Sequence, residues 1–207
     1  SQINKSLDAF TNRMKEFAGV EDVTYAEQLL SSTDFYMSWG RDYQDKEIRY
    51  QVLPVNYSFL EVMGIPVTEG RDFRIEDTNT RYGAYVFNER ARREFGLELG
   101  TMIDSTEVVG FMPDVKFASF RTEVTPMAFF VWGTQNWGHW PNHAYVKVKA
   151  GSDMRAAMEH VRTVLAEFDP EYPFNVRFFD DVLQQLYEKE GTLSMLITLF
   201  SMIAIFI

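Results

Sequence analysis

Apolar side chains recur at helical spacing near both ends of the chain. In the first block they are Ile3, Leu7, Phe10, Met14 and Phe17. This spacing predicts an amphipathic helix, and the glycine at position 19 is a typical place for it to end. A second helix is expected to begin at 152 or 153 and to stop before 169–170. Its apolar face would consist of Met154, Met158, Val161, Val164, Leu165 and Phe168.

Between these helices, short segments with alternating or wholly apolar patterns predict β-strands. The expected strands cover 20–26, 47–55, 84–88, 107–112, 144–148 and 176–179, with a buried apolar run at 127–132. Short helices are expected over 56–63, which Gly64 ends, and over 89–95, which Gly96 ends. Segments 29–45 and 133–142 are interpreted as an irregular excursion and a loop.

The C-terminal segment has a different character. Its last sixteen residues, 192–207, carry no charge and are almost wholly apolar. A membrane-spanning helix needs about 20 apolar residues, so we expect 191–207 to be the start of a transmembrane helix. The alternative is a C-terminal helix buried in a soluble core. We favour the membrane because core helices usually keep a polar face, and this segment offers only two serines and two threonines.

The order of these elements predicts an α+β fold with two small mixed subdomains. The terminal halves, 1–55 and 143–190, would form a discontinuous, membrane-proximal α+β subdomain of βαβ type. Residues 56–142 would form an inserted α/β subdomain. This arrangement brings the two ends of the domain together at the membrane. The chain begins at Ser1 without a visible signal peptide, so we expect targeting information upstream.

Composition excludes several classes of protein. The 207 residues are 46% hydrophobic and 24% charged, which is typical of a globular domain, and the formal net charge is −10. Binding to duplex nucleic acid needs clustered Lys and Arg, so an acidic chain is a poor candidate. It is also poorly suited to lie flat on anionic lipid. Cysteine is absent, which excludes disulfides, thiolate metal sites and a cysteine nucleophile.

Two polar clusters are candidates for chemistry. His139 and His143 are four residues apart, but Pro141 lies between them and no third ligand is near, so a surface loop is favoured over a metal site. A carboxylate cluster surrounds Arg71 and Arg74 and consists of Glu69, Asp72, Glu76 and Asp77. A turn held by Arg–Asp pairs and helix caps is favoured there over acid–base catalysis or calcium binding. No serine lies in a nucleophile elbow, so we expect no catalytic, cofactor-binding or metal-binding residues.

Two aromatic patches are candidates for partner contact, because aromatic side chains are enriched at protein interfaces. The first contains Phe35, Tyr36 and Trp39, and the second contains Trp132, Trp137 and Trp140. Each patch could equally pack over the end of a small core. The sequence leaves both readings open.

The middle of the chain carries four motifs in a fixed order. They contain Tyr57, Phe59 and Gly64, then Gly70, Arg71 and Asp72, then Asn88, and finally Gly110. This series, together with the apolar tail, resembles the extracytoplasmic core domain of MacB/FtsX-like ABC transporter permeases. Ser58 interrupts the family's Tyr-Phe pair, and Phe111 replaces a small aliphatic residue. We interpret the motif residues as determinants of architecture, because they suit tight turns and buried faces.

The resemblance implies a permease with four membrane helices per subunit and this domain between the first and the second. It implies an inner-membrane location, with the domain in the periplasm. Expected partners are a cytoplasmic ABC ATPase that binds ATP, a second permease copy, the lipid bilayer around the flanking helices and a candidate periplasmic adaptor. No cofactor is expected in the domain itself. Relatives handle antibiotics, peptides and lipoproteins, and the sequence does not choose among these substrates.

The resemblance also implies a mechanism, in which ATP-driven motion inside the cell moves the domain outside it. We expect Tyr187, Glu190 and Gly191 to lie in a coupling helix that runs from the domain into the bilayer. Two other function classes stay open. A membrane-anchored extracytoplasmic sensor would need a small-molecule pocket, and an enzyme would need a cleft with perturbed titratable groups.

Overall fold

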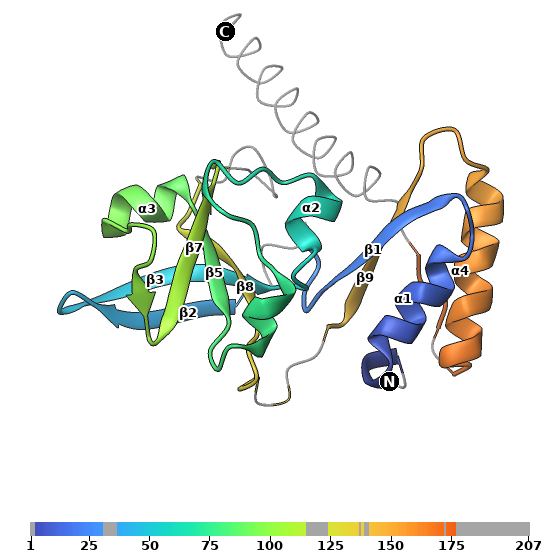
Figure 1. Ribbon diagram of the computed structural model, residues 1–207, viewed down its shortest axis with the longest axis horizontal. Coiled ribbons are helices and arrows are strands. Elements are labelled where there is room, and N and C mark those ends of the chain that lie inside the picture. The colour runs from blue at the N-terminus through green and yellow to red at the C-terminus, as the bar shows by residue number, and fades with distance from the viewer. Residues whose placement is uncertain are drawn as a thin grey trace, which may run out of the picture.

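The computed structural model of the chain describes residues 3–30, 37–114, 124–136, 138, 141–171 and 173–176, and they form two β-sheets (Figure 1). The smaller sheet pairs β1 (Val20–Ala26) with β9 (His143–Val148), two antiparallel strands from distant parts of the chain. Near the N-terminus, η1 (Ile3–Lys5) precedes α1 (Leu7–Lys15). The last described helix is α4 (Met154–Phe168).

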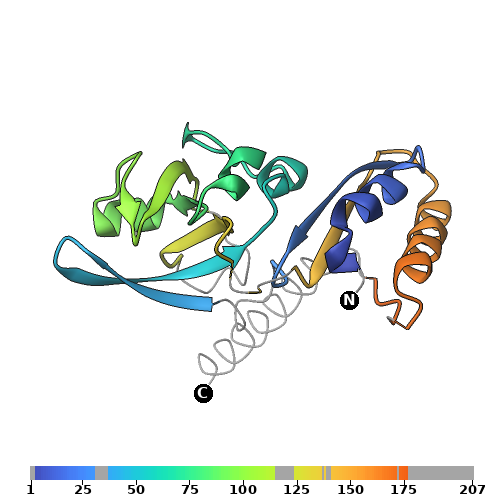
Figure 2. The same ribbon diagram turned by 60° about the horizontal axis from the view of Figure 1, so that its bottom comes forward.

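Helices α1 and α4 pack on the same side of the β1–β9 pair (Figure 2). Phe10 and Met14 from α1 meet Val23 from β1 and Val164 from α4, and all four are buried. The ring of Phe10 also meets Phe168 edge to face, with centroids 5.3 Å apart. The amphipathic patterns at the two chain ends therefore build one shared core, which we call the terminal core.

The larger sheet has seven strands and contains the middle of the chain. Its order along the hydrogen bonds is β2 (Met37–Tyr43), β3 (Lys46–Pro54), β8 (Met127–Val131), β5 (Ala84–Asn88), β7 (Thr106–Met112) and β4 (Glu69–Gly70), with β6 (Met102–Ile103) also on β7. Pairings β3–β8 and β5–β7 are parallel, and the others are antiparallel. The sheet is therefore mixed.

Both faces of this sheet are covered. Along β5, Ala84 and Val86 point into one core, whereas Tyr85 and Phe87 point into the other. Helix α2 (Phe59–Met63) contributes to the first core, and α3 (Glu89–Phe95) contributes to the second. Because β5 is buried on both faces, every one of its residues is buried, and its sequence lacks the polar positions of a half-exposed strand. The turn between α2 and β5 contains η3 (Ile75–Asn79).

The predicted mixed α+β fold is confirmed. Strand β2 lies in the segment that we expected to be irregular, and it is the edge strand of the larger sheet. Its two-residue turn consists of Gln44 and Asp45, which have left-handed φ values of 50° and 60°. Such turns usually contain Asn-Gly, and this sequence signal is missing here. Strands β2 and β3 belong to the larger sheet, so sheet membership changes between β1 and β2 and not at the expected residue 55.

The described helices include none that is long and apolar enough to cross a membrane. The predicted transmembrane helix at 191–207 lies outside the described residues, as do Tyr187, Glu190 and Gly191. Residues 177–179 of the last predicted strand also lie outside them. These assignments stay predictions.

Asn88, from the third sequence motif, joins three segments of the larger sheet. Its side chain is 2% exposed. The Oδ1 atom accepts hydrogen bonds from the backbone N–H of Ala91, at 3.0 Å, and of Met127, at 3.1 Å. The Nδ2 atom donates to the backbone oxygen of Thr125 at 2.9 Å. One amide therefore caps α3 and fixes the start of β8.

We predict that Asn88→Ala lowers the free energy of unfolding by about 3 kcal/mol. The estimate combines a lost cap, worth about 1 kcal/mol, with buried backbone groups left without a partner, at about 1–3 kcal/mol. Chemical denaturation of the domain measures the change. Asn136→Ala is the matched control, because its Oδ1 accepts an exposed bond from the backbone N–H of Gly138. Equal, small losses in both variants would contradict the prediction.

Candidate functional site

The two sheets are joined where β1 ends and β3 ends. Ala26 forms an antiparallel bridge with Val55. The backbone N–H of Glu27 donates to the oxygen of Pro54 at 3.0 Å, and that of Asn56 donates to the oxygen of Tyr25 at 2.9 Å. Main-chain hydrogen bonds thus continue from the smaller sheet into the larger one.

Side chains reinforce this contact. The hydroxyl of Ser58, just before α2, donates to that of Thr24 at 3.0 Å, and Thr24 is completely buried. The ring of Phe59 meets the ring of Tyr145 edge to face at 5.3 Å. The Tyr145 hydroxyl accepts from the backbone N–H of Leu30 at 2.9 Å. Burial raises the pKa of this hydroxyl, so it stays neutral and keeps its hydrogen-bonding role at physiological pH.

The returning chain is tied to the same place. The backbone N–H of Asn142, just before β9, donates to the oxygen of Ala26, and its Nδ2 donates to the oxygen of Glu27, both at 3.1 Å. The chain passes between the two sheets twice, after β1 and before β9, and these two segments are therefore hydrogen-bonded to each other. We call this set the junction; its side-chain members are Thr24, Ser58, Phe59, Asn142 and Tyr145.

On the far side of the smaller sheet, α1 is fastened to α4. The Arg13 guanidinium donates to both carboxylate oxygens of Glu167, each at 2.8 Å. This hydrogen bond lowers the pKa of the Glu167 carboxyl. The Nε2 atom of His160 lies 3.2 Å from the oxygen of Arg13 and 3.0 Å from that of Met14, at the end of α1. Its ring stacks on Phe17 with centroids 5.5 Å apart.

The structure brings together two tryptophans that the sequence placed in separate patches. Trp39 of β2 and Trp132, just after β8, meet with ring centroids 5.8 Å apart, and both contact Phe130. Both are half-buried, so they pack on the core and also reach the surface. The Trp132 Nε1–H donates to the Glu27 carboxylate at 2.5 Å, which connects this aromatic surface to the junction. The other four predicted contact residues, Phe35, Tyr36, Trp137 and Trp140, lie outside the described residues.

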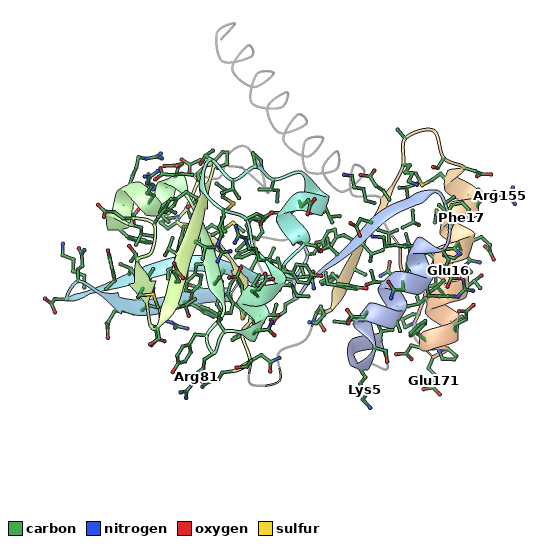
Figure 3. All side chains as sticks on the ribbon, in the orientation of Figure 1. Lys5, Glu16, Phe17, Arg81, Arg155 and Glu171 are labelled. Carbon is green, nitrogen blue, oxygen red and sulfur yellow. The ribbon has the colours of Figure 1, made fainter. Side chains whose placement is uncertain are left out.

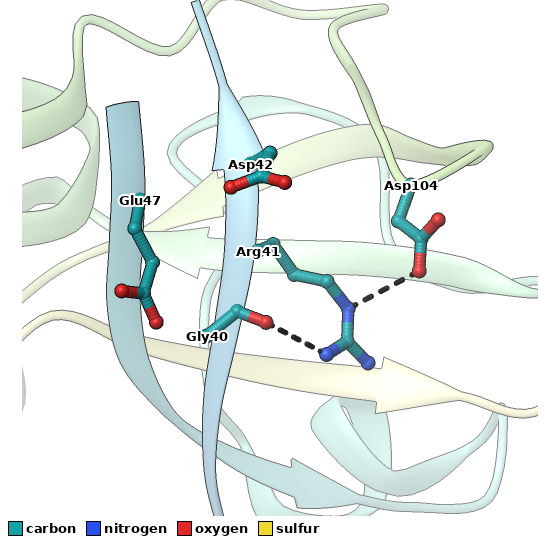
Figure 4. Close-up of a pocket in the computed structure, with 5 residues that line it drawn as sticks. All are labelled: Gly40, Arg41, Asp42, Glu47 and Asp104. Carbon is teal, nitrogen blue, oxygen red and sulfur yellow. Dashed lines mark hydrogen bonds and ion pairs between the residues drawn. The ribbon is translucent and has the colours of Figure 1, made fainter. Parts of the chain in front are cut away.

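A polar pocket of about 420 Å³ lies at β2 (Figure 4). It is lined by Gly40, Arg41, Asp42, Glu47 and Asp104. The Arg41 guanidinium lies 4.6 Å from the centre of the Trp39 ring and donates to the oxygen of Gly40 at 2.9 Å. Its Nε atom lies 3.4 Å from an Asp104 oxygen. Within the described part of the chain, no three His, Cys, Asp or Glu side chains are placed to hold a metal ion.

The second sequence motif and Gly110 form a fold-specifying turn. Gly70 of β4 pairs with Gly110 of β7, and a Cβ atom at either position would overlap backbone of the neighbouring segment. Arg71 donates to both oxygens of Asp77, each at 2.8 Å, and Asp77 is 5% exposed. This confirms the Arg–Asp pair expected for this turn. Asp72 instead accepts from the backbone N–H of Phe73 at 2.6 Å.

The first motif forms α2. Phe59 is completely buried, Tyr57 packs against the same core, and Gly64 ends the helix with a left-handed φ of 69°. The motifs thus place α2 against the junction and fix the β4–β7 edge. A family model for the MacB-like periplasmic core domain matches residues 4–164, a stretch that contains all of these motifs.

The chain belongs to the MacB-like periplasmic core domain family. Such domains are the periplasmic or extracellular parts of ABC transporter permeases. The periplasmic region of MacB from Actinobacillus actinomycetemcomitans has a similar fold, with a TM-score of 0.64 and 14% identity over 87% of this chain and 82% of that one. No curated protein matches the chain in sequence.

Two further solved structures share the fold of this MacB-like domain. The extracellular domain of the noncanonic ABC-type transporter YknZ from Gram-positive bacteria gives a TM-score of 0.55 and 16% identity, covering 77% of this chain and 82% of that one. A domain of a putative permease protein from Porphyromonas gingivalis gives 0.55 and 18%, covering 80% and 82%. At these identities the likeness concerns the fold.

Two junction residues, Ser58 and Phe59, stand out in the sequence only as parts of other motifs. Thr24, Asn142 and Tyr145 do not stand out, because each is an ordinary polar or aromatic residue at a strand or loop position. Their roles depend on contacts between segments far apart in the chain, for which the sequence carries no local signal.

The Arg71–Asp77 pair predicts a pH dependence of stability. Burial disfavours the charged Asp77, but hydrogen bonds from Arg71 and from the backbone of Arg74 outweigh it, so the pKa lies below its ordinary value of 3.8. A carboxyl with a lowered pKa stabilises the fold above its unfolded pKa, and this contribution disappears as the pH falls through the folded pKa. Asp72 acts in the opposite sense, because burial raises its pKa.

We predict that Asp77→Asn lowers the free energy of unfolding by about 2 kcal/mol at pH 7, the size of charged hydrogen bonds lost at a buried site. The loss should shrink as the pH falls below 3.8, because the carboxyl of the unfolded chain then takes up a proton before that of the folded chain. Urea denaturation at pH 7, 5 and 3 measures this, with the exposed Asp42→Asn as control. A loss that stays constant over this range would contradict the assignment.

Proposed function

We propose that this domain is a non-catalytic lever in a MacB-type ABC permease, which couples cytoplasmic ATP hydrolysis to work outside the membrane. The observation that carries the proposal is the junction. Its main-chain bonds and the Ser58–Thr24 and Phe59–Tyr145 contacts join the two sheets. Such a contact passes rigid-body motion with little loss, as in hinge and shear transitions of domains.

The route of motion begins at α1, which in this proposal follows the first membrane helix. Arg13 and His160 fasten α1 to α4, and Phe10 packs α1 onto β1. From β1 the route crosses the junction to β3 and α2, and ends in the larger sheet. Tyr187, Glu190 and Gly191 would provide the second connection to the membrane as a coupling helix. The terminal core is thus the membrane-proximal part.

The proposed partners follow from this role. A cytoplasmic ABC ATPase supplies the motion and binds the ATP, a second permease copy completes the transporter, and the flanking helices lie in the inner-membrane bilayer. The domain itself, in the periplasm, needs no cofactor. The aromatic surface at Trp132 is the proposed contact for a periplasmic adaptor. The external work is efflux or the handling of lipoproteins or peptides.

We predict that loosening the junction uncouples the transporter. The variant is Ser58→Ala with Tyr145→Ala, which removes the hydrogen bonds of the Ser58 hydroxyl to Thr24 and Asn56, the bond to Leu30 and the ring contact with Phe59. In the full-length permease with its ATPase, ATP hydrolysis should stay near the wild-type rate while substrate release falls several-fold. Antibiotics, peptides and lipoproteins are tested as substrates, and thermal unfolding of each variant shows that the domain remains folded.

The matched control is Tyr82→Ala with Thr163→Ala, which removes a tyrosine and a hydroxyl side chain away from the junction. Thr163 is exposed on α4, and Tyr82 is half-buried just before β5, where the Arg81 guanidinium lies 5.1 Å from the centre of its ring. The control should keep both activities. A folded junction variant with full substrate release would contradict the proposed lever.

A further inference from the structure

Strand β2 is an edge strand that is suited to pair with another strand. In the described part of the larger sheet it pairs only with β3, through seven consecutive residue pairs without a bulge. It contains no proline and no lysine, the residues that commonly protect edge strands from pairing. Among the described residues, the strand therefore offers a regular row of backbone groups on the side away from β3.

The hairpin geometry determines which groups these are. The two-residue turn at 44–45 makes Tyr43 and Lys46 a hydrogen-bonded pair. Because bonding alternates along antiparallel strands, Trp39 and Arg41 bond to β3, whereas Ser38, Gly40 and Asp42 direct their N–H and C=O groups to the open side. The bond from the Arg41 guanidinium to the oxygen of Gly40 agrees with this direction.

We propose that β2 pairs antiparallel with β2 of a second copy of this chain, with Gly40 facing Gly40 on the twofold axis. This proposal rests on the pairing of two permease copies in the proposed function, and it assigns the surface through which the external domains meet. Such an interface uses the same patch on both copies, so the patch must be complementary to itself.

The sequence of β2 meets this requirement in that register. Glycine at the axis adds no side chain to either face of the sheet, and the group nearest to its Cβ position is the Glu47 carboxylate. Ser38 faces Asp42 of the second copy, where its hydroxyl can donate to the carboxylate. On the other side of the strand, Trp39 faces Arg41 of the second copy. Each guanidinium can then lie over an indole, as Arg41 already does within its own chain.

Other registers with the same hydrogen-bond alternation are worse. A shift by one residue pair toward the turn places Arg41 opposite Arg41, and a further shift places Asp42 opposite Asp42. Like charges directly opposite each other destabilise a strand pair. A shift in the other direction places Trp39 opposite Trp39 and Arg41 opposite Met37, so the guanidinium groups no longer face the indoles. The register centred on Gly40 uses the whole strand, including Met37 opposite Tyr43 of the second copy.

Disulfide cross-linking tests this proposal, because the sequence described here contains no cysteine. Gly40→Cys is introduced into the full-length permease, and any cysteines elsewhere are replaced. Membranes that contain this variant together with its ATPase are then treated with an oxidant. Facing residues of a hydrogen-bonded pair lie about 5.5 Å apart between Cα atoms, which is within the range that a disulfide bridges. Arg49→Cys is the matched control, because Arg49 is paired with Gly40 across the same hairpin but lies one strand away from the axis.

The proposal predicts a several-fold larger fraction of disulfide-linked permease dimer for Gly40→Cys than for Arg49→Cys. It also predicts that adding Arg41→Asp to Gly40→Cys reduces this fraction several-fold, while adding Arg155→Asp, on exposed α4, leaves it unchanged. Equal cross-linking at both positions, or a Gly40→Cys adduct with a different protein, would overturn it.

The mass of the detergent-extracted complex distinguishes a failure of this interface from a failure of the proposed function. If two permease copies co-purify with the ATPase but Gly40→Cys forms no dimer, the β2 interface is wrong and the lever is unaffected. A permease that purifies as a single copy without an ATPase would overturn the pairing of copies itself, and with it this interface.

Discussion

The hydrogen bonds between the end of β1 and the end of β3 are the constraint on which the two-sheet architecture depends. Ala26 and Val55 bridge two strands that belong to different sheets, and Thr24 is buried where Ser58 reaches it. Buried backbone groups need partners, so separating the sheets would leave several of them unsatisfied at once. One of these bonds therefore cannot open without straining or breaking its neighbours, and this makes the junction stiff.

This constraint also explains the order of elements along the chain. The terminal segments form one core because α1 and α4 come from opposite ends and cover the same two strands. The middle of the chain leaves that core after β1 and returns just before β9, and Asn142 ties the return to the exit. The larger sheet can therefore form between these two points without disturbing the terminal core. In the proposed lever, membrane helices act on the terminal core and partners meet the larger sheet.

The sequence predicted most helices and central strands, because their apolar periodicity is strong and local. It placed Gly70 and Gly110 in family motifs, and the structure gives the reason, since the two residues pair across strands that approach closely. It missed β2, whose pattern lacks a continuous apolar face and whose turn lacks glycine. It did not foresee that Trp39 and Trp132 meet, because β2 and β8 are brought together only through β3. Long-range pairing of this kind has no signature in a single sequence.

The claim that the two sheets move as one body is tested most directly by a distance measurement in the full-length transporter. Spin labels on Arg81→Cys, in the larger-sheet part, and Arg155→Cys, on α4, lie in different parts of the molecule (Figure 3). Pulsed electron spin resonance then gives the distance between them in nucleotide-free and ATP-trapped states. The account predicts the same narrow distance distribution in both states. A shifted or broadened distribution with ATP would show that the junction bends, and would contradict the account.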